Sequence, residues 1–529
     1  MCKTIAMKFN MNIIYKVLAC CVVILGITSC HDKLEEDLEN RVTTGDVDFT
    51  VAEDMILPLY GAYSEMYNER GWEGIPLISV RGDDVNAGGY GDQQPFFMTD
   101  RYVYDQGFWM YNNVWGLEYT SIFRMLDAQE QIELYRKHSD NPNADQYIAE
   151  TNVMKAWLLR NLANTWGDVL IPVTSDPFDM PSAKVSTYSE VMQYISDLMD
   201  EAIPHLPDMH PNERTDVEGG ITKYTALAIK AMVNLELKNF QGVADATSQI
   251  ISSNKFALHN DFYHLFKNKG ELCSENIFEL QFSDYGEAAG DQETYLFAFY
   301  GPQSWTPKVE GSNAGWGFYE PSLKWIKFML DRGEQTRLQT SVLFTDKGIA
   351  EIIKDTKYAT LPDWISNTTP SGDQISDYER ANFSSGKHYL PTEQLTSGRK
   401  EYANGKNYIL IRYAEILLMH AEAMVQGATS SAMTADDAVK LVRERAGLSA
   451  ISGVTLDQVL DEKFAELAME HGSRFQDLVR YKKYSELSYC DRYDEAHGTR
   501  QFTADKVFLP YPLAQLDQLP NLRAYADGQ

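Results

Sequence analysis

Apolar residues recur every three or four positions along much of this chain, which is the spacing of an amphipathic α-helix. The clearest stripe runs over 191–203. Thr187 and Glu190 precede it as a capping box, and Pro204 ends it because proline cannot continue a helix. A similar stripe behind a second capping box covers 456–468. The pattern predicts a mainly α-helical protein.

The predicted helices come in pairs separated by short connections. Small residues recur on the faces that we expect to be inner ones, at Ala226, Ala231, Ala244 and Ala421. Helix hairpins of this size with closely packed alanines resemble tetratricopeptide units, although no full repeat consensus is present. The largest expected pairs are 223–238 with 241–252, 409–425 with 435–446, and 113–136 with 145–165.

Three long tracts between the helices lack regular periodicity: 70–108, 283–321 and 347–406. They are rich in glycine, aromatic residues, aspartate and asparagine. Long irregular segments in a compact protein often carry its function. The fold class that we expect is therefore a tetratricopeptide-like helix-hairpin scaffold with long irregular loop regions.

The N-terminus has the pattern of a bacterial lipoprotein signal. Three lysines and no acidic residue precede Cys30, and an apolar stretch over 17–27 is too short to span a bilayer. It ends in Ile-Thr-Ser-Cys at 27–30, which resembles a lipobox. We expect a signal peptide over 1–29, lipidation of Cys30, an acidic tether over 30–48 and a single domain over 49–529. The alternative is an ordinary cleaved signal in which Cys30 plays no part.

The formal net charge of −29 argues against binding to nucleic acid or to an anionic membrane surface. Loss of the three signal lysines would make the mature chain more acidic still. Cys273 and Cys490 are the cysteines that would remain beyond Cys30, and their distance in sequence gives no disulfide framework. We expect two unpaired thiols, with pairing left open.

Several segments, in order along nearly the whole chain, resemble the SusD/RagB family of outer-membrane nutrient-binding lipoproteins. No single motif is specific, but the ordered set is. Its charged residues, such as Arg412, Glu415, Glu462, Lys463 and Glu466, have the spacing of structural ion pairs rather than of a catalytic group. The segments are LRNLANTWGDV at 159–169, TYSEV at 187–191, ITKYTALA at 221–228, IRYAE at 411–415, RERAGL at 443–448, EKFAELA at 462–468, GSRFQDLVR at 472–480 and FLPYP at 508–512.

This resemblance implies a non-enzymatic function. A SusD-like protein is lipid-anchored to the outer membrane and faces the cell exterior. It captures an oligosaccharide or polysaccharide and delivers it to a SusC-like TonB-dependent transporter, closing over that partner as a lid. The resemblance implies no cofactor.

Motifs for nucleophilic, phosphate-binding or metal-dependent catalysis are missing from the sequence. We therefore expect no catalytic residue and no metal. His420, on an otherwise apolar helix, is expected to be a core histidine. A surface glycosidase would need only two carboxylates, and the best pair is Asp83 with Asp84. Adjacent residues on an extended chain point to opposite sides, which suits one active site poorly.

Sugars offer apolar CH faces and hydroxyl rims, so a binder needs flat aromatic rings beside carboxylates, amides or arginine. Two tracts supply that mixture, at about 70–109 and 283–321, and the glycan site of the resembled family is built from loops in these two regions. The predicted ligand-binding residues are Trp72, Arg81, Asp83, Asp84, Asn86, Tyr90 and Trp109 in the first tract, and Tyr295, Trp305, Asn313 and Trp316 in the second, with Tyr319 beside them. Trp316 also fits a structural element that enters the next helix.

Three alternatives remain open from the sequence. The same fold could carry peptides, the protein could be a glycosidase, or it could be a structural partner subunit without a ligand of its own. The sequence does not indicate which glycan, linkage or chain length is bound.

Overall fold

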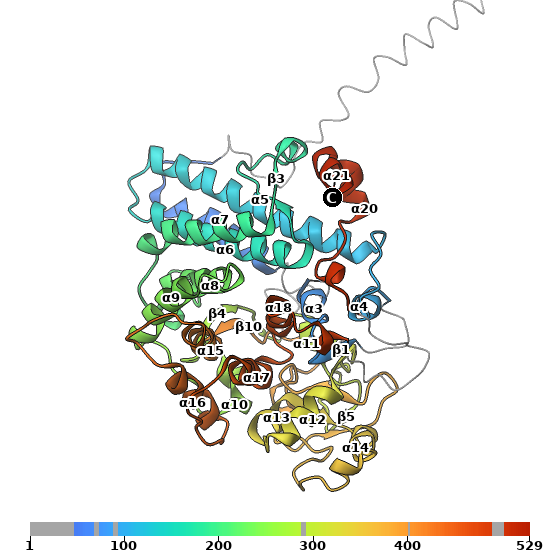
Figure 1. The fold of residues 1–529 in the computed structure, drawn as a ribbon. Helices are drawn as coiled ribbons and strands as arrows, with labels where there is room; N and C mark the ends of the chain where they lie inside the picture. The colour runs from blue at the N-terminus through green and yellow to red at the C-terminus, as the bar shows by residue number, and fades with distance from the viewer. Residues whose placement is uncertain are drawn as a thin grey trace, which may run out of the picture. The chain divides into compact units, whose positions relative to one another are not determined.

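Successive helix hairpins stack on one another in the computed structural model (Figure 1). It describes residues 47–67, 74–87, 94–286, 293–399, 402–488 and 502–528. Residues Ala52–Gln529 form one compact unit, separate from Met1–Val51. The predicted signal, Cys30 and Cys490 lie outside the described residues, and no described helix is long and apolar enough to cross a bilayer.

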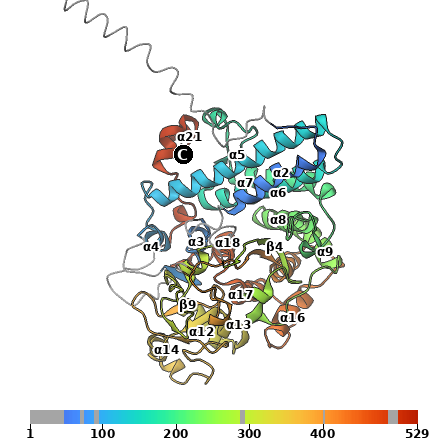
Figure 2. The same cartoon turned by 180° about the vertical axis from the view of Figure 1, so that it is seen from behind.

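The helical array joins the first half of the unit to its C-terminal part. Each helix packs on the next, from α5 through α9, and α9 then packs on α15, which contacts α16 and α17 (Figures 1 and 2). Helix α2 covers α5 and α6. The helices of the array are α2 (Leu57–Glu65), α5 (Trp109–His138), α6 (Ala144–Trp166), α7 (Tyr188–Ala202), α8 (Lys223–Glu236), α9 (Phe240–Ser252), α15 (Tyr413–Val425), α16 (Ala435–Arg445) and α17 (Leu456–Leu467).

Local sequence accounts for these helices well. Both predicted capping boxes are present, with Thr187 and Thr455 each accepting a hydrogen bond from the backbone three residues on. Helix α7 ends at Ala202, immediately before Ile203 and Pro204. The four alanines expected on inner faces are fully buried, so they let neighbouring helices approach closely. The mainly helical, tetratricopeptide-like architecture predicted from periodicity is confirmed.

One predicted helix boundary is wrong. Residues 409–412 do not begin α15 but belong to strand β10 (Tyr408–Arg412), which pairs antiparallel with β4 (Asn276–Leu280). A short apolar run fits a buried strand as well as a buried helix, and the pairing partner lies more than 100 residues away. As a result Arg412 precedes α15 and does not share a helix face with Glu415.

Short helices and small sheets make up the rest of the unit, most of them in its second half (Figure 2). Five two-stranded antiparallel sheets occur among the described residues: β1–β6, β2–β3, β4–β10, β5–β8 and β7–β9. The remaining strands are β1 (Val85–Ala87), β2 (Val169–Leu170), β3 (Val185–Ser186), β5 (Trp305–Thr306), β6 (Tyr319–Pro321), β7 (Val342–Phe344), β8 (Gln374–Ile375) and β9 (Phe383–Ser385). The remaining α-helices are α3 (Gly74–Ser79), α4 (Gln94–Asp100), α10 (Phe262–Leu265), α11 (Leu296–Tyr300), α12 (Leu323–Asp331), α13 (Thr336–Ser341), α14 (Asp346–Ile353), α18 (Ser473–Arg480), α19 (Tyr484–Leu487), α20 (Leu513–Gln518) and α21 (Pro520–Asp527).

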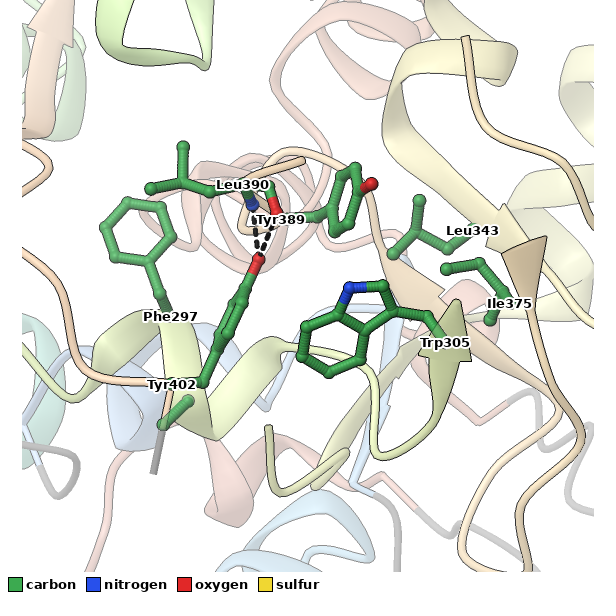
Figure 3. Close-up of a cluster of buried hydrophobic side chains, with 8 residues drawn as sticks. Phe297, Trp305, Leu343, Ile375, Tyr389, Leu390 and Tyr402 are labelled. Atoms are coloured by element: carbon green, nitrogen blue, oxygen red, sulfur yellow. Dashed lines mark hydrogen bonds between the residues drawn. The ribbon is translucent and has the colours of Figure 1, made fainter. Parts of the chain in front are cut away.

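An aromatic core holds the irregular tracts together (Figure 3). The Tyr402 hydroxyl donates to the Leu390 carbonyl at 2.7 Å and accepts from the Leu390 N–H. Rings and aliphatic groups from six short segments meet around this contact, so the core fixes loops that have little regular structure of their own. Its members are Phe297, Ala298, Trp305, Leu343, Ile375, Tyr389, Leu390 and Tyr402.

The Trp-Gly-Asp turn at 166–168 connects the helical array to the C-terminus. Trp166 packs edge-to-face on Trp115, with ring centroids 5.2 Å apart. The Asp168 carboxylate accepts from the Tyr525 hydroxyl at 2.6 Å, and Tyr511 donates to the Asp168 carbonyl at 2.7 Å. The predicted aromatic turn is therefore also the anchor for the FLPYP segment and α21.

We expect Gly167→Ala to destabilise the protein by about 1–3 kcal/mol, because Gly167 has φ +80° and ψ −106°, a conformation nearly restricted to glycine. An added Cβ would also lie 2.9 Å from the Phe508 ring. Gly333→Ala is the matched control. It has φ +69° with nothing within 4 Å of the added Cβ, so it should cost only backbone strain, about 1–2 kcal/mol. Thermal unfolding of both variants measures the difference in their loss of stability. An equal loss in the two variants would contradict the steric clash with Phe508.

Buried ion pairs surround Glu466, on α17. Its carboxylate accepts from Arg412 at 2.6 Å, from Arg337 at 3.1 Å and from Arg445, and all four side chains are at most 5% exposed. Arg412 also binds Glu275 and Glu470. The charged residues of the C-terminal motifs thus hold β10, α13, α16 and α17 together, as their structural interpretation predicted.

Candidate functional site

The two sequence tracts expected to carry the site meet in the folded unit. Strand β1 of the first tract pairs with β6 of the second, with Asn86 opposite Glu320. Phe96 on α4 packs edge-to-face on Phe299 and Tyr319, with centroids 4.9 and 5.9 Å apart. Sheet pairing and ring packing therefore join 85–87 and 94–100 to 299–321.

A stacked pair of aromatic rings lies at the surface of the second tract. The Tyr295 and Trp316 rings are 6.2 Å apart and nearly parallel, with an interplanar angle of 17°. Tyr295 is 37% exposed and Trp316 is half-buried. The backbone N–H of Trp316 donates to the Ala298 carbonyl at 2.6 Å, and its ring packs against the aromatic core beneath. The pair is therefore a rigid, partly exposed apolar surface.

Charged and amide groups border this pair. Glu293, two residues before Tyr295, binds the guanidinium of Arg399, which also binds Asp284. Burial opposes ionisation of Asp284, but hydrogen bonds from Arg399 and Thr396 outweigh it and lower the pKa of this carboxyl. The exposed Asn313 donates its backbone N–H to the Arg399 carbonyl at 3.4 Å. A carboxylate and an amide thus lie within three residues of the two rings in the chain, and Arg399 contacts both of these segments.

The other predicted tryptophans lie elsewhere. Trp305 is 3% exposed and belongs to the aromatic core (Figure 3), so its ring stabilises the loops rather than forming a surface. Trp109 is 48% exposed on the first turn of α5. Trp72 and Tyr90 lie outside the described residues, and their predicted role stays a prediction.

The predicted polar residues of the first tract are buried and bind other parts of the chain. Arg81, with no exposed surface, donates to the carbonyls of Val507 and Asn164 at 3.0 Å each. Asn86 is 2% exposed within β1. Arg81 therefore ties the first tract to the C-terminal part and to the end of α6, and neither side chain is exposed at the surface.

Asp83 and Asp84 point to different partners, as the sequence predicted, although they lie in a bend rather than on extended chain. Asp83 accepts from Arg474 at 2.7 Å and from Lys324 at 2.6 Å. Burial acts against these ion pairs, yet the pKa of Asp83 falls below its usual value. Asp84 accepts from the backbone N–H of Met469 at 2.7 Å, and burial raises its pKa to about 6. Because both are at most 3% exposed, they hold the fold rather than face a substrate.

These opposite shifts predict opposite effects of two isosteric variants. Between about pH 4 and 6 the folded state holds the Asp84 proton that the unfolded state has lost, so this group lowers stability as pH rises. Asp84→Asn can keep the Met469 hydrogen bond and should gain stability relative to wild type as pH rises from 4 to 7. Asp83→Asn should lose about 1–3 kcal/mol at pH 7, since Arg474 and Lys324 lose their charged partner. Urea unfolding at several pH values tests both; an Asp84→Asn difference that does not change with pH would contradict the shift.

Sequence reasoning missed the polar border of the aromatic pair. Asp284, Tyr285, Glu293 and Arg399 were not among the predicted residues, although Tyr285 is 75% exposed. Three of them lie in the second predicted tract. Their charged or aromatic side chains, close to Tyr295 in the sequence, were a signal by which they could have been predicted. Arg399 comes from the third tract, 86 residues beyond Asn313 by number, and no local pattern links it to the others.

The described residues show no cluster of three or more histidine, cysteine, aspartate or glutamate side chains that could hold a metal ion. Cys273 is a half-buried free thiol, and its predicted relation to Cys490 stays untested. His420 contacts the Thr247 hydroxyl at 2.8 Å and the Met433 carbonyl at 3.0 Å, which confirms the expected core histidine.

Comparisons with known proteins agree with this architecture. A model described as the SusD family matches residues 274–526, and one described as starch-binding and associating with the outer membrane matches 84–235. SusD-like protein P2 of Formosa agariphila is 24% identical over 487 residues, covering 88% of this chain and 90% of that protein. The chain belongs to the SusD-like family.

Solved structures share the fold. Surface glycan-binding protein A of Bacteroides thetaiotaomicron, in complex with laminarihexaose, superposes with a TM-score of 0.69 at 23% identity, covering 88% of this chain and 97% of that one. A laminarin-binding SusD-like protein gives a TM-score of 0.71 at 21% identity, with coverage of 88% and 97%. The helical scaffold with irregular insertions is thus the SusD-like fold.

Proposed function

We propose that this protein binds a glycan at the cell surface, and that the stacked pair Tyr295–Trp316 is the centre of its binding site. The observation that carries the proposal is this partly exposed, nearly parallel pair beside Asp284, Glu293 and Arg399. Rings of this kind match the CH face of a pyranose, and the polar border matches its hydroxyls. The glycan- and laminarin-binding activities of the two structural relatives support the same function.

The cellular setting is also part of the proposal. The lipobox-like residues 27–30 and the family description support a lipoprotein of the outer membrane, anchored through Cys30 and facing outward. Such a protein would hold its glycan for a SusC-like TonB-dependent transporter, which supplies the energy of import. Binding needs no chemistry, so we propose that the protein is not an enzyme.

Titration of the soluble chain, starting after Cys30, against a panel of polysaccharides tests the proposal. The panel should include laminarin, starch, other plant glycans and mucosal glycans, with affinity gels for screening and calorimetry for the positives. Retardation by at least one polysaccharide is the expected result. The same preparation should be tested with mixed peptides, since binding to peptides alone would replace glycan by peptide as the cargo.

The glycosidase alternative has its own measurement. Incubation with each retained polysaccharide should release no reducing ends, because the best predicted carboxylate pair is buried against Arg474, Lys324 and Met469. Hydrolysis abolished by Asp83→Asn or Asp84→Asn in a folded variant would contradict the binding-only function.

A further inference from the structure

A pocket of about 250 Å³ lies between α2, the loop 217–220 and strand β4. It is a separate feature from the Tyr295–Trp316 pair, on different secondary-structure elements. Pockets of roughly 300–1,000 Å³ take drug-sized molecules, so this one has the size for a single sugar ring. Its lining is mainly aromatic and aliphatic with a few polar groups, and it includes Tyr60, Tyr63, Ser64, Tyr67, Phe278 and Gln281.

Three tyrosines at positions 60, 63 and 67 follow one face of α2 and its end, as helical spacing requires. Tyr60 is 44% exposed, so its ring is available at the mouth of the pocket. Its hydroxyl donates to the Asp216 carbonyl at 3.1 Å. Tyr63 accepts from the Ile221 N–H at 2.7 Å and donates to Glu150. Both rings are therefore held by hydrogen bonds at their tips.

Buried charges hold the two tyrosines in place, although these charged residues do not themselves line the pocket. Arg214 binds Glu150 at 2.9 Å and Asp216 at 2.8 Å, and the Arg214 and Glu150 side chains are at most 1% exposed. The same residues anchor Tyr60 and Tyr63, so loop and helix form one rigid wall. Pre-organised walls reduce the entropy cost of binding.

Glycines keep the pocket open beside the loop. Gly219 has φ +66°, and a Cβ there would lie 2.5 Å from the Gln281 amide nitrogen. A Cβ at Gly220 would lie 3.1 Å from the Tyr63 hydroxyl. A Cβ at Gly220 would also lie 2.8 Å from the Val217 carbonyl oxygen, so a larger residue at either position would force the pocket lining to shift.

The pocket also lies close to the polar border of the first site. Gln281 lines the pocket and Asp284 binds Arg399, and three residues of extended chain span at most about 10 Å. Asn407 fixes this connection, donating to the Gln281 side chain at 2.8 Å and accepting from the Phe282 N–H at 2.8 Å. Along this connection, the Phe282 ring packs on the Tyr67 ring of the pocket, with centroids 5.4 Å apart. The pocket and the polar border are therefore within reach of one oligosaccharide.

We infer that the pocket formed by α2, 217–220 and β4 is a second sugar subsite, which takes one pyranose ring of the glycan bound at Tyr295–Trp316. This inference rests on the proposed glycan-binding function. Tyr60 supplies the exposed ring face, and Gln281, Ser64 and the backbone of 217–220 supply hydrogen-bonding groups. A ligand long enough to fill both subsites should bind more tightly than one that fills only the first.

Calorimetry with two lengths of one ligand tests the subsite. The probes are a hexasaccharide and a disaccharide of the polysaccharide that the wild type retains, with laminarihexaose and laminaribiose as the first pair. We expect Tyr60→Ala to weaken hexasaccharide binding fivefold or more and to leave disaccharide binding unchanged. Tyr60→Phe keeps the ring and should bind like wild type. Phe178→Ala, an 88% exposed aromatic that does not line this pocket, is the control for general surface effects.

The outcomes separate the inference from the function on which it rests. Wild-type affinity of Tyr60→Ala for the hexasaccharide, with binding reduced in Tyr295→Ala, would overturn the second subsite and leave the proposed function intact. Reduced binding in Tyr60→Ala with no effect of Tyr295→Ala would keep this pocket and reject the Tyr295–Trp316 site. If the wild type retains no polysaccharide, the proposed function fails and this inference fails with it. Circular dichroism confirms that each variant is folded.

Discussion

Tyr295→Ala is expected to reduce the affinity for the retained glycan by at least tenfold. The ring is 37% exposed and stacked on Trp316 at 6.2 Å, so its removal takes away half of the proposed platform. Truncation of a central aromatic contact commonly costs about 2 kcal/mol or more, and 1.4 kcal/mol corresponds to a factor of ten. Calorimetry with the polysaccharide selected by the affinity gel measures the change.

Two further variants of the aromatic pair make this result specific. Tyr295→Phe retains the stacked ring and should keep most of the affinity, whereas Trp316→Ala should lose as much as Tyr295→Ala. Trp316 also packs on the core, so its variant needs a stability measurement beside the titration, and Tyr295→Ala is the cleaner test. Unchanged affinity in a folded Tyr295→Ala variant would reject the site.

Arg399→Gln probes the polar border separately from the rings. This change removes the cation that pairs Asp284 and Glu293 and leaves two neighbouring carboxylates that repel each other. A loss of affinity without a loss of thermal stability would place the guanidinium in the glycan contact. A parallel loss of affinity and thermal stability would show that Arg399 stabilises the loops instead.

The largest expected effect on stability is that of Glu466→Gln, at about 3–5 kcal/mol. Three arginines converge on this fully buried carboxylate, Arg337, Arg412 and Arg445. They also lower its pKa strongly although burial acts in the opposite direction. Removing one partner of a buried ion pair leaves uncompensated charge in the interior. The free-energy cost of that charge exceeds the stability that the intact pair contributed. Glutamine has nearly the same shape, so the loss reports the charge and not a cavity.

Asp145→Asn is the matched control for this change. Asp145 pairs with Arg136 at 2.6 Å, but the two side chains are 58% and 39% exposed. Water screens such a pair, and surface ion pairs contribute about 0–1 kcal/mol. Urea or thermal unfolding of both variants should therefore differ clearly. Similar small losses for Glu466→Gln and Asp145→Asn would show that the buried network is not needed for stability.

The low folded-state pKa of Glu466 also sets a direction for pH dependence. The carboxylate remains ionised in the folded state at pH values where the unfolded chain becomes protonated, so its contribution is present above the ordinary glutamate pKa of 4.5 and fades as pH falls below it. The Gln variant lacks that contribution, and its stability should approach that of wild type as acid is added.

The sequence by itself determined the scaffold of this protein. Helical periodicity, the capping boxes at Thr187 and Thr455 and the buried alanines are local patterns, because a helix satisfies its backbone hydrogen bonds within one short segment. The sequence also located the two tracts that meet through β1 and β6. These features depend on residues that are close in the chain.

Tertiary structure alone decided what the individual loop residues do. Trp305 and Trp316 are separated by 11 positions and share the same tract. Trp305 lies in the core against Tyr402, whereas Trp316 is half-buried and stacks on the partly exposed Tyr295. From the sequence, Asp83 is a loop carboxylate predicted to bind ligand. In the structure it forms an ion pair with Arg474, which is nearly 400 residues away in the chain. Likewise β10 is a strand because β4 lies beside it. Burial and pairing depend on distant partners, which local residue patterns do not specify.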